Sequence, residues 1–169
     1  TDVFVRALGN EMQKTLGQSV VVENRPGANQ IIGAEACARA VPDGYTICLT
    51  GTDINSLNPH LFTKLPYNPE TDLAPVTPLF FLQEGLIVNP ALKTNSMAEL
   101  IAIGKQRPDL LNYGSFGEGS ALQLFMEWFK SRTGVHAAHV PYRGGAPLVQ
   151  ALLSGEIQMV HFGLGNVTE

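Results

Sequence analysis

The sequence predicts an α/β protein with largely parallel sheets, and three observations lead to this fold class. Short β-branched or apolar segments alternate along the chain with segments whose apolar residues recur at helical spacing. Glycine, proline and asparagine clusters separate the two kinds of segment. Hydrophobic residues make up 44% of the 169 residues and charged residues 15%, which is typical of a globular chain with a core. We therefore expect helices packed on mostly parallel sheets.

The first expected element is a helix that Thr1 or Asp2 caps and Gly17 ends. Its apolar residues recur at every fourth position and form one face: Phe4, Leu8, Met12 and Leu16. The chain thus opens directly on a helix, although an α/β arrangement predicts a strand before it.

The next part of the chain reads as strand, helix, strand and loop. The expected elements are a strand at 20–23, a helix at 31–40, a strand at 45–50 and a polar loop at 51–59. Cys37 and Cys48, the only two cysteines, fall in this helix and in the second strand. We expect two buried thiols, although the spacing also permits a disulfide.

A proline-rich, irregular stretch at 65–76 precedes the remaining elements. These are strands at 79–82 and 85–88, a helix from a capping box at Ser96, a helix after Ser120 that ends at Gly134, a strand at 137–140, a helix that Gly155 ends and a strand at 157–162.

The most informative stretch runs from Leu111 to Gln123 and reads as strand, tight glycine–serine loop and helix start. The first turn of a helix has backbone N–H groups without intrahelical partners, so it can hold a carboxylate or phosphate. An ordinary loop capped by Ser120 explains the same residues, and the sequence leaves both alternatives open. The stretch lacks the third glycine of a dinucleotide fingerprint, a phosphate-loop lysine and a nucleophile elbow.

Four loops that follow expected strands are rich in glycine or small polar residues: those at Thr52, at 115–120, at 142–145 and at 163–165. In parallel sheets the ligand crevice lies beyond the carboxyl ends of the strands. The recurrence of such loops therefore predicts a binding pocket at this edge.

Several function classes are disfavoured. The formal net charge is −4 and no basic run is present, so we expect no nucleic-acid partner. No apolar run is long enough to span a bilayer. His136 and His139 flank a strand without a third ligand, and no nucleophile–base pair can be recognised, so we expect no metal, cofactor or catalytic residue.

Several motifs, in this order, resemble one family over almost the whole chain. They are Val21–Ala28, Pro42–Thr46, Asn58–Tyr67, Leu111–Ser115, Gly117–Ser120 and His139–Pro147. The chain resembles the periplasmic substrate-binding proteins of tripartite tricarboxylate transporters, also called Bug-type solute receptors. The resemblance implies a two-lobed, periplasmic-binding-protein type II-like fold. Residues 1–88 would be part of lobe one, and residues 89–169 most of lobe two.

The resemblance also implies a function. The protein would be a monomeric, periplasmic receptor whose signal peptide is removed, and it would deliver a mono-, di- or tricarboxylate or an amino acid to membrane transporter subunits. The positions that match the family's ligand contacts are Asp2, Thr52, Ser115, Gly117, Gly119, Ser120, Ala121, Gln123, Tyr142, Gly144 and Gly145. Asp2 could instead serve only as a helix cap.

The sequence departs from the family pattern in several respects, among them Gln158 where aspartate is frequent and His161-Phe162-Gly163 near the end of the last strand. Asn29-Gln30 replaces a usual glycine pair, and Gln123 stands where histidine is frequent. Family members also extend beyond both ends of this sequence, so we expect the chain to lack the first strand and the returning part of lobe one. An α/β enzyme for acyl or phosphoryl transfer and a non-binding fragment are the alternatives.

Overall fold

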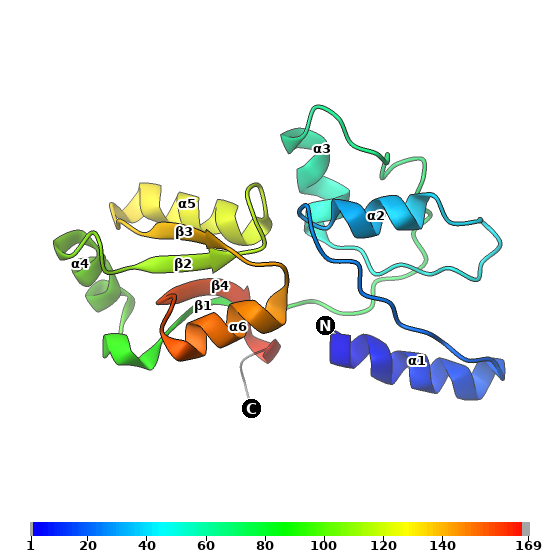
Figure 1. The fold of residues 1–169 in the computed structure, drawn as a ribbon, viewed down its shortest axis with the longest axis horizontal. Coiled ribbons are helices and arrows are strands. Elements are labelled where there is room, and N and C mark those ends of the chain that lie inside the picture. The colour runs from blue at the N-terminus through cyan, green and yellow to red at the C-terminus, as the bar shows by residue number, and fades with distance from the viewer. Residues whose placement is uncertain (1, 167–169) are drawn as a thin grey trace.

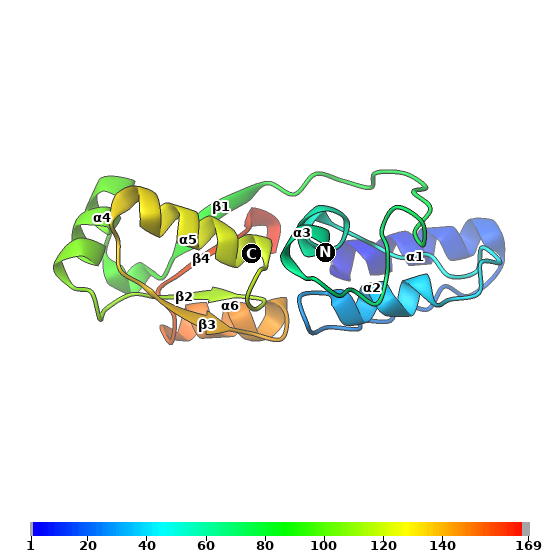
Figure 2. The same ribbon diagram turned by 90° about the horizontal axis from the view of Figure 1, so that it is seen from above.

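The computed structural model describes residues 2–166, which form two groups of elements joined by an extended segment before β1 (Figure 1). We call residues 2–83 the helical half and residues 84–166 the sheet half. The helical half contains α1 (Asp2–Leu16), α2 (Ile31–Ala38), a π-helical turn (Asp53–Leu57) and α3 (Asn58–Leu61). The two halves lie side by side in both views (Figures 1 and 2).

The sheet half is built on one four-stranded sheet in the order β1-β4-β2-β3. Its strands are β1 (Glu84–Val88), β2 (Asn112–Ser115), β3 (Ala138–Pro141) and β4 (Met159–Gly163). β2 is parallel to both β3 and β4, with Tyr113 paired to His139 and Met159, whereas β1 is antiparallel to β4. The predicted α/β class with a mainly parallel sheet is confirmed, and β1 is its antiparallel exception.

Helices cover both faces of this sheet (Figure 1). They are α4 (Met97–Gln106), α5 (Ala121–Thr133) and α6 (Gly145–Ser154). α4 and α5 bury Leu100, Met126 and Phe129 with Tyr113 and Met159 of the sheet. The other core joins α6 to the opposite face through the side chains Leu148, Ala151, Leu152, Ile157, Val160 and Phe162. Successive side chains of a strand point to opposite faces of the sheet, so neighbouring residues of β2 and β4 belong to opposite cores.

The helix ends follow the capping signals in the sequence. The Ser96 and Ser120 side chains accept hydrogen bonds from the N–H groups of Glu99 and Gln123, at the starts of α4 and α5. Gly134 and Gly155 end α5 and α6 with φ values of 72° and 82°, a left-handed conformation that glycine adopts without a steric penalty.

The helical half departs from the prediction because no strand is assigned in its described residues. The segments 20–23, 45–50 and 79–82, which we predicted as strands, have no regular secondary structure and do not pair. Their apolar side chains Val21, Tyr45, Ile47 and Phe81 are exposed. The backbone N–H and C=O groups of a strand need a neighbouring strand to bond to. A segment with strand-like composition does not by itself provide that neighbour. The predicted loop at 51–59 is also wrong, because it forms the π-helical turn and the start of α3.

The prediction of two free thiols is wrong, because Cys37 and Cys48 form a disulfide. Cys37 lies on α2, as predicted, and Cys48 lies on the segment that follows. The disulfide ties that segment to α2 beside a small core of Ala34, Ile54 and Tyr67. Sequence spacing alone could not decide this pairing, because it depends on the approach of two side chains in space.

Two further observations concern the organisation of the chain. β1, which we placed at the end of lobe one, pairs with β4 in the sheet half, and the exact division between lobes stays a prediction. None of the helices within residues 2–166 has both the length and the hydropathy that crossing a membrane requires.

Candidate functional site

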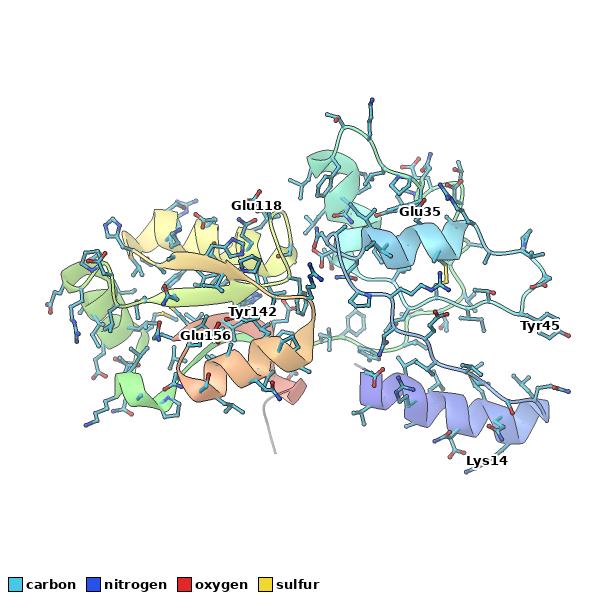
Figure 3. All side chains as sticks on the ribbon, in the orientation of Figure 1. Lys14, Glu35, Tyr45, Glu118, Tyr142 and Glu156 are labelled. Atoms are coloured by element: carbon cyan, nitrogen blue, oxygen red, sulfur yellow. A yellow bond between two sulfur atoms is a disulfide. The ribbon has the colours of Figure 1, made fainter. Side chains whose placement is uncertain are left out.

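The candidate site lies where β2 and β3 end and α5 and α6 begin. β2 and β3 are parallel, so the loops that follow them leave the same edge of the sheet. This edge faces the helical half (Figures 1 and 2). Glu118 marks the tip of the loop after β2, and Tyr142 follows β3 (Figure 3).

Ser115 organises the loop after β2. Its side chain is fully buried, and its hydroxyl accepts a 3.0 Å hydrogen bond from the Gly117 N–H. The hydroxyl also lies 2.6 Å from Nε2 of His139. Gly117 and Gly119 have φ values of 119° and 79°, so the loop needs glycine at both positions. The predicted glycine–serine bend therefore forms, with Ser115 as its internal support.

The backbone amides of this bend have acceptors inside the protein. The Gly119 N–H donates to Oε1 of Gln123 at 2.6 Å, and the Gln123 N–H donates to the Ser120 hydroxyl at 3.4 Å. The Ser120 hydroxyl donates in turn to the Gly117 carbonyl at 2.7 Å. Ala121, the first residue of α5, donates its N–H to Oδ1 of Asp53 at 2.8 Å. A carboxylate thus already sits at the start of α5, and it is an internal one.

A row of side chains on β2 and β3 supports the bend from behind. The ring of His139 stacks on Tyr113, whose hydroxyl donates to Glu127 on α5. Burial, and then the hydrogen bond to Glu127, raises the pKa of Tyr113 well above its ordinary value. Burial lowers the pKa of His139 below 6.5, so its ring is neutral near pH 7. This row fixes the Ser115 hydroxyl without introducing a positive charge.

The Ser115–His139 pair has the composition of a nucleophile and its base, and sequence reasoning missed it. The two residues are 24 positions apart, and only the register of β2 beside β3 brings them together. Ser115 is nevertheless 0% exposed, so a substrate atom has no access to its hydroxyl. We assign the pair a positioning role in the loop.

The start of α6 is the second helix start at this edge. Gly144 precedes the helix with a φ of 129°, Gly145 is its first residue, and within the described residues no side chain caps it. Tyr142 donates its N–H to the Ser115 carbonyl at 2.8 Å, which ties the two loops together. Its hydroxyl donates to Glu156 at 2.7 Å, and the two side chains lie together in Figure 3. Gly145 and Ala146 therefore present first-turn N–H groups to an anion, whereas Pro147 has none.

The site residues predicted in the helical half, Asp2 and Thr52, are exposed, whereas Asp53, next to Thr52, is buried. Asp2 is exposed at the start of α1 and accepts hydrogen bonds from Arg6 and Asn24 of its own half, which lower its pKa. Thr52 is exposed and makes no side-chain cap. Asp53, which follows it, reaches α5. The sequence signal for Asp53 was only its place in a polar loop after an expected strand.

Two shallow hollows lie away from this edge, one lined by residues 107–110 and the other by α1. Residues 2–166 contain no group of three or more histidine, cysteine, aspartate or glutamate side chains placed to hold a metal ion.

The fold and this edge define the class of protein. The structure is similar to Rpa4515 of R. palustris with adipate, at a TM-score of 0.91 and 34% identity over 98% of this chain and 56% of that one. It is also similar to MatC of Rhodopseudomonas palustris with bound malate, at a TM-score of 0.87 and 29% identity over 98% of this chain and 56% of that one. A further likeness, to the periplasmic binding protein BugD at a TM-score of 0.86 and 31% identity over 94% of this chain and 53% of that one, places the fold among periplasmic binding proteins.

The family follows from the sequence match. The chain belongs to the tripartite tricarboxylate transporter receptor family, whose model matches residues 4–167. Protein BugT of Bordetella pertussis is 38% identical over 158 residues, which cover 93% of this chain and 48% of BugT. The chain spans about half the length of the relatives it matches.

Proposed function

We propose that this chain forms part of an extracytoplasmic receptor that binds a small carboxylate solute and presents it to a membrane transporter. The observation that carries the proposal is the pair of helix starts, of α5 and α6, at one sheet edge that faces the other half of the chain. Each helix start bears partial positive charge. The Asp53 carboxylate already opposes that of α5, whereas the start of α6 can hold a solute carboxylate without a lysine or arginine.

The start of α6 suits one acidic end of a solute, and the polar bend beside it suits a second end that is acidic or polar. Adipate and malate, named with the two similar structures, are dicarboxylates. The amides of Gly144 and Gly145 would receive one carboxylate directly. The bend with Ser115, Gly117, Gly119, Ser120, Ala121 and Gln123 would form the adjoining wall, and Tyr142 would support both loops. Asp2 and Thr52 would line the opposite lobe.

The remaining parts of the proposal follow from the family and from the chemistry of the chain. The Cys37–Cys48 disulfide supports a periplasmic location, because disulfides persist in oxidising compartments. The family match supports transporter subunits as partners of the receptor. The buried Ser115–His139 pair argues for binding without chemistry on the solute.

Isothermal calorimetry with mono-, di- and tricarboxylates tests this function. We expect a dicarboxylate such as adipate to bind, and Gly145→Asp to weaken its binding by about tenfold or more, because a fixed carboxylate then repels the solute from the start of α6. An aspartate in the first turn suits the helix, so the fold is retained.

Gln150→Glu is the matched control, because it adds the same charge at an exposed position farther along α6. Its affinity for adipate should equal that of the unmodified chain. Equal affinities for the Gly145→Asp and Gln150→Glu variants would remove α6 from the site, and no binding of any carboxylate would refute the function for this chain.

A further inference from the structure

Asn29, in the loop before α2, has a buried side-chain oxygen without a hydrogen-bond donor. The residue is 5% exposed, and within residues 2–166 no donor reaches its Oδ1. A buried acceptor without a donor costs free energy, so folded proteins contain few of them. Such an atom therefore indicates a donor that water or a ligand supplies.

The hydrogen bonds of Asn58 fix which branch of the Asn29 amide is the oxygen. Nδ2 of Asn58 donates to the backbone carbonyl of Asn29 at 3.1 Å and to the Tyr67 hydroxyl at 3.2 Å. A carbonyl can only accept, so Asn58 must turn its nitrogen toward that carbonyl and its oxygen toward the Asn29 side chain. Nδ2 of Asn29 donates to this oxygen at 2.7 Å. A flip of the Asn29 amide would set two oxygens against each other, so Oδ1 is the branch without a partner.

The backbone around Asn29 is held in an uncommon conformation. Ala28, Asn29 and Gln30 are consecutive residues with positive φ, at 45°, 50° and 66°. Such values are unfavourable for residues with a side chain and persist where surrounding contacts hold them, often at ligand sites. Asn58, which is 0% exposed, provides those contacts through both bonds to Asn29. The backbone and Asn58 together therefore fix the position of Oδ1.

Asn29 belongs to the side of the helical half that meets the sheet edge. The start of α2 lies toward the sheet half in both views (Figures 1 and 2). Gln30 donates to Asp53 at 2.7 Å, and Asp53 accepts the Ala121 N–H from the start of α5. None of the ion pairs in the described part of the chain includes Asp53. This side thus offers an acceptor and negative charge, whereas the start of α6 offers donors and partial positive charge.

We propose that Oδ1 of Asn29 accepts a hydrogen bond from the solute, and that the solute is a carboxylate that also carries a hydroxyl or an ammonium group. The inference rests on the proposed function and names the solute class of the same site. Carboxylates are ionised near pH 7 and have no hydrogen to donate. A plain dicarboxylate can therefore satisfy α6 but not Asn29, whereas a hydroxy acid or an amino acid can satisfy both.

Isothermal calorimetry with malate, aspartate and succinate tests the proposal. The three acids share one skeleton and differ at one carbon, which carries a hydroxyl, an ammonium group or only hydrogen. We expect malate or aspartate to bind about fivefold more tightly than succinate, the effect of one hydrogen bond to a buried acceptor, and the tighter of the two identifies the donor. Asn29→Gly suits the left-handed backbone and removes the acceptor, so this ratio should fall to about one. Asn55→Ala, which replaces an exposed asparagine of the same half, is the control and should keep the ratio.

The affinity ratio separates a solute contact from a purely structural role of Asn29. Loss of the bond to Asn58 alone would weaken all three acids equally and leave the ratio unchanged. A second measurement needs no variant: in a ¹⁵N–¹H spectrum the side-chain NH₂ resonances of Asn29 should move further with the tighter-binding acid than with succinate.

The outcomes distinguish this inference from the proposed function. Equal affinities of the three acids for the unmodified chain, a ratio that Asn29→Gly leaves unchanged, or equal movement of the Asn29 resonances would overturn the proposal and assign Oδ1 to an internal water. The proposed function would stand in each of these cases, because the acids still bind. If none of them binds, nor adipate, the proposed function itself fails and this inference fails with it.

Discussion

Removal of the Cys37–Cys48 disulfide should weaken the helical half and leave the sheet half unchanged. The bond joins residues with a sequence separation of 11. Closing a loop of this length reduces the entropy of the unfolded chain by an amount worth about 3 kcal/mol at 25 °C. The core beside the disulfide is small, whereas the sheet half has two cores of its own. We therefore expect the double variant Cys37→Ser/Cys48→Ser to lose stability locally.

Native-state hydrogen exchange measures this loss segment by segment. Protection of the α2 amides should fall about a hundredfold in the double variant, which corresponds to about 3 kcal/mol. Protection of the α5 amides, and urea unfolding followed by the single tryptophan, Trp128 on α5, should not change. A thiol reductant should reproduce the effect in the unmodified chain and have none on the variant. Equal protection of α2 in both proteins, or an equal loss in α5, would refute the reasoning.

Three further predictions concern the sheet half. Gly114→Ala should lower the free energy of unfolding by about 1–3 kcal/mol in urea titrations, because the added Cβ would lie 2.6 Å from Ile157 Cδ1 in a filled core. Gly51→Ala, where nothing lies within 4 Å, is the control and should change it by less than about 0.5 kcal/mol. Ser120→Ala should cost about 1 kcal/mol through loss of the α5 cap, and an unchanged urea midpoint would contradict this. Burial lowers the pKa of His161 below its usual 6.5, so the unfolded chain binds more protons between the two values. Stability should fall as the pH drops through that window, and His161→Gln should reduce the fall; an identical pH profile would argue against it.

The sequence was most informative where local rules decide the structure. The caps Ser96 and Ser120 and the helix-ending Gly134 and Gly155 act within one turn of the chain, so their effects can be predicted without a fold. The glycine–serine bend after β2 was likewise predicted as a turn before a helix. The combined order of motifs also identified the family.

The predictions failed where an element depends on distant partners. The segments at 20–23, 45–50 and 79–82 have strand-like composition, yet pairing is absent within the described helical half. The free-thiol prediction for Cys37 and Cys48 failed for a related reason, because their separation along the chain does not give their distance in space.

The sequence alone determined the α/β class, the family and the presence of a small-residue loop before α5. Each of these depends on the spacing of apolar residues or on the order of residues along the chain. Only the tertiary structure decided which groups meet at that loop. It set Ser115 beside His139 across the β2–β3 register, and it brought Asp53 from the other half of the chain onto the start of α5. The physical reason is that a hydrogen bond or a charge acts over a few ångströms in space, whatever the number of residues between the partners.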